Sequence, residues 1–144
     1  MGSIEATSTI PLPPEKVWAG ITNLDDYGKW MTIHTRWKGD VPAQLSKGSQ
    51  YAEVITMMGM ANTITWTVEE YEPNKLFKSS GVGMAGVKTT TTIALAPEGE
   101  GTKVTLGSEF SGNIIKGPLA KAIEKAGLKD LQASVAKLTE FLSA

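Results

Sequence analysis

The sequence predicts an α+β fold in which a seven-stranded antiparallel sheet curls around one long C-terminal helix. Between residues 118 and 142, apolar side chains recur every three to five residues, with lysine, glutamate and glutamine on the opposite side, which is typical of an amphipathic helix. Before it, six strand-like segments follow one another through short turns, and short turns can join only antiparallel neighbours. Because no second long helix is available, the apolar side of this helix has to pack against the sheet. A curled sheet around a helix also leaves room for an internal apolar cavity.

The elements before the long helix can be assigned in order. Apolar and polar residues alternate from 3 to 10, as in a half-buried strand, and Pro11, Pro13 and Pro14 end it. Two short helices follow, over 15–22 and 23–27, and Asn23 is a suitable cap for the second. Met58-Gly59-Met60 indicates a tight hairpin. The other strands are expected at 33–38, 50–57, 63–71, 76–80, 88–96 and 102–110.

Composition limits the classes of function. The 144 residues are enough for one domain over 1–144 and too few for two ordinary ones. A net charge of -1 with scattered lysines offers no basic patch for nucleic acid. No apolar run is long enough to span a membrane, and the N-terminus lacks a secretory signal pattern. The absence of cysteine excludes disulfides and thiolate chemistry and fits a cytoplasmic location.

No metal or cofactor is expected. One histidine and no cysteine leave only carboxylate clusters as metal ligands, and none has a recognisable spacing. Gly81, Gly83 and Gly86 have the spacing of a dinucleotide fingerprint, but that fingerprint needs a helix directly after it. Four consecutive threonines follow instead, over 89–92, which favours a strand and a flexible hairpin.

Two uncommon side chains lie close together in the segment 33–38. His34 is the only histidine and Arg36 the only arginine, and a spacing of two places both on one face of a strand. If that face is internal, the pair could bind or polarise a carbonyl or carboxylate group. The alternative is that the opposite face points inward, with Ile33, Thr35 and Trp37, and that His34 and Arg36 are solvated. The alternation of apolar residues favours this alternative.

Tyr51 and Glu53 form a similar pair on the next expected strand. Their spacing is equally compatible with a pocket and with an exposed strand face, where Glu53 would pair with a lysine. Catalytic residues cannot be assigned from these patterns, and the candidates are His34, Arg36 and Tyr51.

The topology predicts where a ligand would enter. In an antiparallel meander the turns near 59 and 84 and the start of the last helix share one end of the sheet, and these segments are apolar, whereas the turns at the other end are polar. Methionine adapts well to ligands of different shape, although these methionines could instead plug the core. Trp66 lies two residues from both Ile64 and Val68, so it faces the same side of the strand and should line the concave face. The candidate ligand-binding residues are Trp30, Tyr51, Glu53, Met58, Met60, Trp66, Met84, Thr91, Phe110, Ile114, Leu119 and Ile123.

Four segments resemble the START/Bet v 1-like (SRPBCC) superfamily: 11–18 (PLPPEKVW), 27–30 (YGKW), 66–73 (WTVEEYEP) and 101–105 (GTKVT). They are most similar to its polyketide cyclase/dehydrase and lipid-transport branch. The segments 30–34 (WMTIH), 81–83 (GVG) and 86–88 (GVK) resemble, more narrowly, mycobacterial members described as toxins of type II toxin–antitoxin pairs. The resemblance implies a helix-grip fold with an internal apolar pocket, and this fold hosts carriers, cyclases and regulators.

Three functions are expected on these grounds. The first is binding of a hydrophobic or aromatic small molecule, such as a lipid or polyketide, for carriage or sequestration. The second is a polyketide aromatase/cyclase in which Tyr51, Arg36 or His34 orients a poly-carbonyl chain in a water-poor cavity. The third, which only the resemblance implies, is a toxin with an antitoxin protein as partner. The sequence predicts neither the oligomeric state nor whether a reaction is catalysed.

Overall fold

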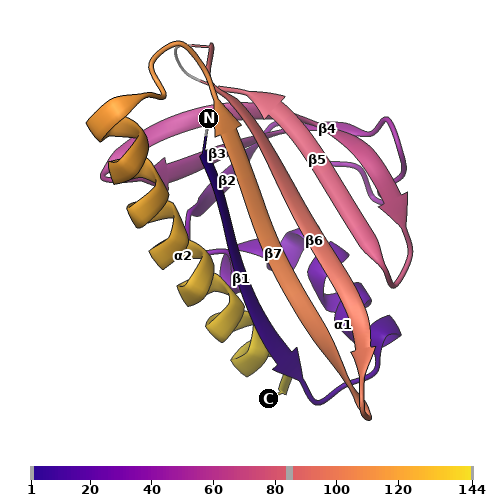
Figure 1. Cartoon of the computed structure of the whole chain (residues 1–144). Helices are drawn as coiled ribbons and strands as arrows, with labels where there is room; N and C mark the ends of the chain where they lie inside the picture. Colours follow the sequence, from indigo (N-terminus) through magenta and orange to yellow (C-terminus); the bar gives the residue numbers. More distant parts are fainter. Residues whose placement is uncertain (1, 84–85, 144) are drawn as a thin grey trace.

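A computed structural model of the chain describes residues 2–83 and 86–143. Short helices follow the first strand, and the remaining strands precede one long helix, as Figure 1 shows. The elements are β1 (Gly2–Ile10), α1 (Pro14–Thr22), the 3-10 helix η1 (Leu24–Lys29), β2 (His34–Lys38), β3 (Gln50–Met57), β4 (Met60–Glu72), β5 (Leu76–Val82), β6 (Lys88–Glu98), β7 (Gly101–Ser111) and α2 (Gly117–Ser143).

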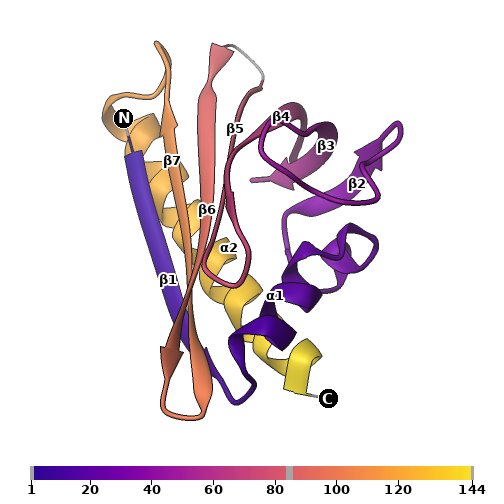
Figure 2. The ribbon, with the colours of Figure 1, turned by 90° about the vertical axis from the view of Figure 1, so that its right-hand side faces the viewer.

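The strands form one seven-stranded antiparallel sheet in the order β1-β7-β6-β5-β4-β3-β2. From β2 to β7 each strand pairs with the next along the chain, and β1 pairs with β7. The sheet curls so that β2, β3 and β4 turn away from the plane of β1 and β7, and α2 lies across the inside of the curve (Figure 2). The predicted fold class and strand number are therefore confirmed.

The apolar stripe of α2 serves two purposes along its length. In the C-terminal half, Leu131, Val135 and Leu138 are buried in the main core, together with side chains from the sheet and α1. In the N-terminal half, Leu119 is 42% exposed and Ile123 is half-buried. Because α1 lies toward the C-terminal end of α2 (Figure 2), the core fills that end of the molecule and leaves the other end less tightly packed.

Local signals explain most element boundaries. The Asn23 side chain accepts a hydrogen bond from the Asp25 backbone N–H at 3.2 Å, which confirms it as the cap of the second short helix. Met58 and Gly59 form a two-residue turn, so β3 and β4 extend to the turn itself and β4 begins at Met60, three residues before the expected start. Gly81, expected in a turn, lies in β5 opposite Trp66 and Thr89.

The prediction that His34 and Arg36 share one face of their strand is wrong. The pairing of β2 with β3 shifts between these residues, so that His34 lies opposite Ile55 and Arg36 opposite Val54. Such a bulge adds one residue to the strand and inverts the facing of the residues after it. The His34 side chain is 7% exposed, whereas Thr35 and Arg36 are exposed, so the alternative is wrong for Thr35 and for a solvated His34. It is right for Ile33 and Trp37, which pack against the core, and for the solvated Arg36.

Within the described residues, no helix is both long and apolar enough to cross a membrane.

Candidate ligand cavity

A cavity of about 420 Å³ lies between the concave face of the sheet and α2, mainly the N-terminal half of that helix. Its volume falls within the range of small-molecule sites. The lining residues come from β1, η1, β3, β4, β6, β7 and α2 and from the segments before β2, β4, β6 and α2, and most of them are apolar. Ile64, Trp66 and Phe110 form part of its wall from the sheet, and Ile123 and Leu131 face them from α2. The cavity is therefore the space that the curled sheet and α2, from Leu119 to Ser134, leave between them.

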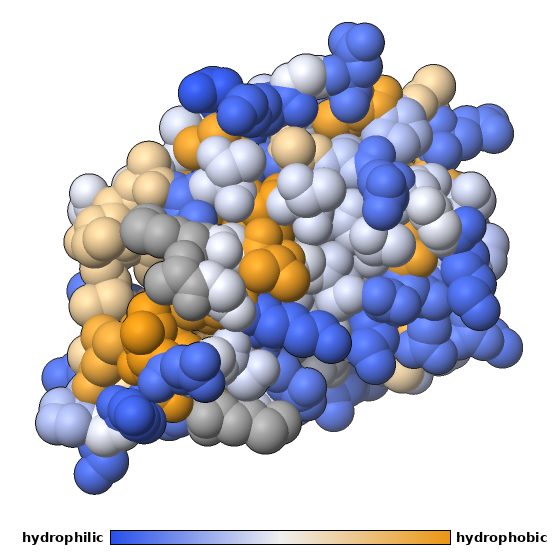
Figure 3. Space-filling view, turned by 90° about the horizontal axis from the view of Figure 1, so that it is seen from above, coloured by the Kyte–Doolittle hydropathy of each residue, from blue (hydrophilic) through white to orange (hydrophobic). Residues whose placement is uncertain are grey.

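Exposed apolar side chains surround one end of this cavity. Met58 is 55% exposed, Met60 59% and Ile114 45%, and these three residues line the cavity together with Leu119. Figure 3 looks at this end of the molecule and shows hydrophobic residues gathered on one side of it. The β3–β4 turn and the start of α2 thus share one end of the sheet, as the topology predicts. We call these four residues, Met58, Met60, Ile114 and Leu119, the apolar rim.

A buried carboxylate lies at the inner end of the cavity. Glu53 on β3 is only 3% exposed. One of its oxygens accepts a hydrogen bond from the Trp66 indole N–H at 2.9 Å, and the other lies 2.6 Å from Nδ1 of His34. Glu53 and Trp66 line the cavity, whereas His34 contacts Glu53 from outside the lining. The two nitrogen partners stabilise a charge whose burial without partners would be costly.

An aromatic cluster surrounds this carboxylate. The Tyr27 ring packs edge-on against His34, with centroids 5.3 Å apart, and lies 5.2 Å from Trp37. Trp37 in turn packs edge-on against Tyr51 at 5.4 Å. Among the described residues, no hydrogen bond engages the Tyr27 hydroxyl, which leaves it available at the cavity wall.

Burial raises the pKa of both cluster tyrosines. It raises the pKa of Tyr27 well above the ordinary value, and the nearby charge of Glu53 adds to the effect. Burial also raises the pKa of Tyr51 to about 12, opposed by a hydrogen bond with Ser79 and reinforced by Glu53. Both side chains are neutral O–H groups at physiological pH, as an ordinary tyrosine is, and the raised pKa keeps them neutral further into alkali.

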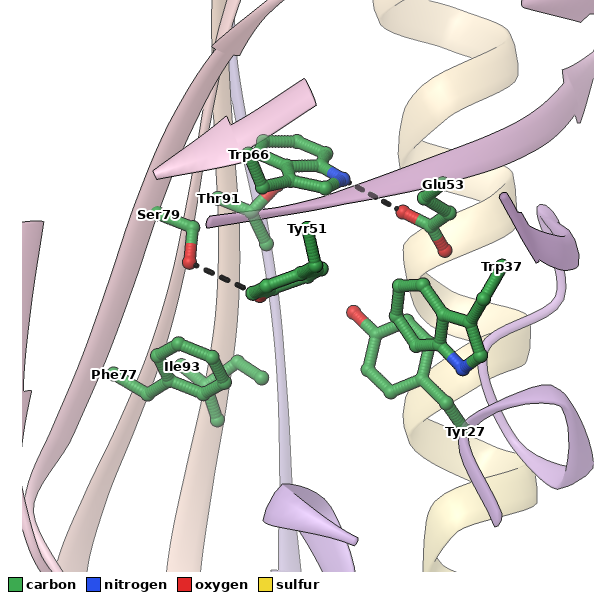
Figure 4. A pocket seen from close by; sticks show the side chains of 9 residues that line it. All are labelled: Tyr27, Trp37, Tyr51, Glu53, Trp66, Phe77, Ser79, Thr91 and Ile93. Atoms are coloured by element: carbon green, nitrogen blue, oxygen red, sulfur yellow. Dashed lines mark hydrogen bonds between the residues drawn. The ribbon is translucent and has the colours of Figure 1, made fainter. Parts of the chain in front are cut away.

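A small side pocket adjoins the inner end of the cavity. Its volume of about 20 Å³ is enough for a single water. Tyr51 and Ser79 line it and approach each other to 3.4 Å between their hydroxyl oxygens (Figure 4). The side pocket and the cavity share four lining residues: Tyr27, Glu53, Trp66 and Thr91. The side pocket is thus an extension of the larger cavity with a higher share of polar groups in its lining.

Most of the predicted ligand-binding residues line the cavity. These are Glu53, Met58, Met60, Trp66, Thr91, Phe110, Ile114, Leu119 and Ile123. Tyr51 lines only the side pocket. Met84 lies outside the described residues. Whether any of these residues binds a ligand stays a prediction.

Trp30 and Arg36 lie away from the cavity. Trp30 follows η1 and is fully buried, packed edge-on against Tyr27 with centroids 5.0 Å apart, so it belongs to the core and not to the lining. Arg36 is exposed because of the bulge in β2. Of the three candidate catalytic residues, only Tyr51 lines either space, and His34 acts on the site through Glu53.

Several lining residues were not found from the sequence. Tyr27 lies in η1, a short helix whose orientation no periodic pattern fixes. Asp130 and Ser134 lie on α2, where polar side chains suggested a solvated face. Ser134 is buried and its hydroxyl accepts a hydrogen bond from the Thr32 backbone N–H at 3.0 Å. The width of the gap between a helix and a curled sheet is a tertiary property, so no local pattern signals these residues.

Among the described residues, no cluster of three or more histidine, aspartate or glutamate side chains could hold a metal ion.

Comparison with known proteins agrees with this architecture. Residues 1–142 match the family described as polyketide cyclase / dehydrase and lipid transport, and the chain belongs to this family. The uncharacterized protein Rv1546 of Mycobacterium tuberculosis is 31% identical over 141 residues, covering 98% of this chain and 99% of the relative. Toxin Rv0910 of the same organism is 30% identical over 135 residues, covering 94% of each chain.

A solved structure shows the same fold. The Zhui aromatase/cyclase from Streptomyces sp. R1128 superposes with a TM-score of 0.77 at 14% identity, covering 99% of this chain and 93% of that one. At this level of identity the likeness concerns the fold alone.

Proposed function

We propose that the protein binds a hydrophobic or aromatic small molecule, such as a lipid or a polyketide, for carriage or sequestration. The observation that supports this best is the cavity of about 420 Å³ whose apolar lining continues into the exposed apolar rim. Apolar side chains exposed at an open cavity are stabilised when a ligand covers them. The family description, which includes lipid transport, supports the same class of function.

The proposal is tested by filling the cavity from the sheet side. Thr91 on β6 lines the cavity, and its neighbour Thr90, which lines neither space, points to the other face of the sheet. We expect Thr91→Phe to weaken binding of the neutral fluorescent dye N-phenyl-1-naphthylamine at least about tenfold, equivalent to about 1.4 kcal/mol. The matched control Thr90→Phe should leave the affinity within about twofold of the wild type.

Thermal unfolding of both variants, followed by circular dichroism, verifies that they fold. Dye binding by folded Thr91→Phe at wild-type affinity would contradict a ligand site in the cavity. Loss of binding in both variants would show that a bulky residue in β6 disturbs the sheet, and that filling of the cavity is not the cause.

A second candidate function is that of a polyketide aromatase/cyclase, which the family description supports. Catalysis would then consist mainly of holding a poly-carbonyl chain in a water-poor space. The Tyr27 hydroxyl is the best-placed donor for polarising a ketone, because it lines the cavity and stays protonated. Recovery of a bound polyketone unchanged would favour carriage, whereas turnover that Tyr27→Phe abolishes would favour cyclisation.

The third candidate function, a toxin with an antitoxin partner, is supported by the name of one relative at 30% identity. Growth arrest on expression, relieved by the product of a neighbouring small reading frame, would support it.

A further inference from the structure

The charged groups of the cavity lining are all acidic. Glu53 and Asp130 line it, and no lysine, arginine or histidine of the described part of the chain does so. His34 contacts the Glu53 carboxylate from outside the lining, so a ligand inside the cavity meets the carboxylate first. An anionic group brought to this inner end would find no cationic partner among the described lining residues.

Glu53 keeps the capacity to accept a further hydrogen bond. A carboxylate offers about four lone-pair positions. His34 and Trp66 occupy one on each oxygen, at 2.6 Å and 2.9 Å. Glu53 therefore presents an acceptor to the cavity, and its partners fix the direction of the carboxylate.

Tyr27 supplies the complementary donor. Its side chain lines both the cavity and the side pocket, as Glu53 does, and the two groups are close enough for the Glu53 charge to act on the Tyr27 hydroxyl. Figure 4 shows Tyr27 and Glu53 on the same side of the side pocket, across from Ser79. Since no hydrogen bond from the described part of the chain engages the Tyr27 hydroxyl, the inner end offers one available donor beside one acceptor.

We infer that the cavity selects a neutral apolar ligand with a hydroxyl group at its inner end, an alcohol or a phenol, and rejects the corresponding carboxylate; this rests on the proposed function. A hydroxyl can donate to Glu53 and accept from Tyr27 at the same time. An ester or ketone can accept from Tyr27 alone. A carboxylate can only accept, and it places a like charge beside Glu53, which is buried in a mostly apolar lining.

The test uses three probes with one chain length: tetradecan-1-ol, methyl tetradecanoate and tetradecanoate. Each displaces N-phenyl-1-naphthylamine from the full-length protein at neutral pH, and the fluorescence decrease gives its affinity. We expect the alcohol to bind most tightly and the carboxylate at least about tenfold more weakly than the alcohol. The ester should lie between them because it engages one of the two polar groups.

Two variants separate the roles of the two groups. Glu53→Gln removes the charge at nearly constant volume and should reduce the alcohol-to-carboxylate affinity ratio by about tenfold. Glu70→Gln, an exposed position on β4, is the matched control and should leave the ratio unchanged. If Glu53→Gln does not fold, Tyr27→Phe still tests the donor, and it should weaken the alcohol and the ester by about fivefold each.

The outcomes distinguish this inference from the function on which it rests. The inferred selectivity would be overturned if tetradecanoate bound the wild type as tightly as the alcohol does. It would also be overturned if the alcohol-to-carboxylate affinity ratio were unchanged in folded Glu53→Gln. Either result would leave ligand binding itself intact. Failure of the dye and of all three probes to bind the wild type would overturn the proposed function, and the selectivity with it.

Discussion

At the scale of single residues, the Glu53 carboxylate depends on its nitrogen partners. It is 3% exposed and is held by His34 and Trp66. Removing one donor from a buried charged acceptor leaves the cost of its desolvation without compensation. His34 therefore contributes to stability through Glu53, although it lies outside the cavity lining.

We expect His34→Phe to lower the free energy of unfolding by about 2–3 kcal/mol, because it keeps an aromatic ring against Tyr27 but removes the Nδ1–H donor. The control is Arg36→Gln, since Arg36 is exposed on the other side of the bulge, and it should change stability by less than about 0.5 kcal/mol. Urea unfolding of both variants measures the difference. Equal effects would show that the contact between His34 and Glu53 does not stabilise the fold.

The buried tyrosines make stability depend on pH in alkali. Burial raises the pKa of Tyr51 to about 12 and that of Tyr27 well above its ordinary value. The unfolded chain loses these protons from pH ~10, whereas the folded chain keeps them, so the free energy of unfolding falls as the pH rises from about 10 toward 12.

We therefore expect the ultraviolet titration of the native protein to show less tyrosinate at pH ~10.5 than the same protein in urea. Tyr51→Phe should reduce that difference. A native titration that coincides with the unfolded one would contradict the burial of both hydroxyls.

At the scale of elements, the β3–β4 hairpin has an unusual turn residue. Met58 has φ 54° and Gly59 φ 77°, so both occupy the left-handed region, as in the two-residue turns that favour Asn-Gly. A residue with a long side chain is less stable in this conformation than asparagine. Met58 is 55% exposed and belongs to the apolar rim, so the proposed ligand binding would account for a residue that the turn does not favour.

Met58→Asn should raise the free energy of unfolding by about 0.5–1 kcal/mol because asparagine tolerates the positive φ. Met60→Asn is the control: Met60 is exposed to a similar extent, at 59%, but begins β4, where asparagine is disfavoured. Urea unfolding should therefore show opposite signs for the two variants. Stabilisation of both by the same amount would show that exposure of the methionines, and not turn geometry, decides the effect.

The elements differ in how far sequence predicts them. The alternation in β1 and the spacing in α2 come from periodic burial, and short turns require antiparallel neighbours, so these features can be predicted from local patterns. The bulge in β2 cannot be predicted in this way, because it changes the pairing with β3 and leaves no mark in the residue types of the strand. It reverses the facing of Arg36 relative to His34. For that reason the pair predicted on one face is separated in the structure.

At the scale of the whole molecule, one helix serves both a core and a cavity. The C-terminal half of α2 contributes Leu138 to the core, and the N-terminal half contributes Leu119 and Ile123 to the cavity lining. The position of the rim could be predicted, because alternation of turns along a meander is a property of topology. The polar inner end could be predicted only in part: Glu53 is a candidate from its spacing with Tyr51, whereas Tyr27, on a short helix far from β3 in the sequence, joins the same lining only through the tertiary fold.

The cavity between the sheet and α2 should hold an apolar molecule in the cell. Native mass spectrometry of the protein purified from its own host tests this most directly, with Thr91→Phe and Thr90→Phe purified in parallel. We expect the wild type and Thr90→Phe to carry one small neutral molecule that collisional activation releases, and Thr91→Phe to appear at the mass of the chain alone. A wild type without any bound molecule, or a bound molecule that persists in Thr91→Phe, would contradict a ligand-binding role for the cavity.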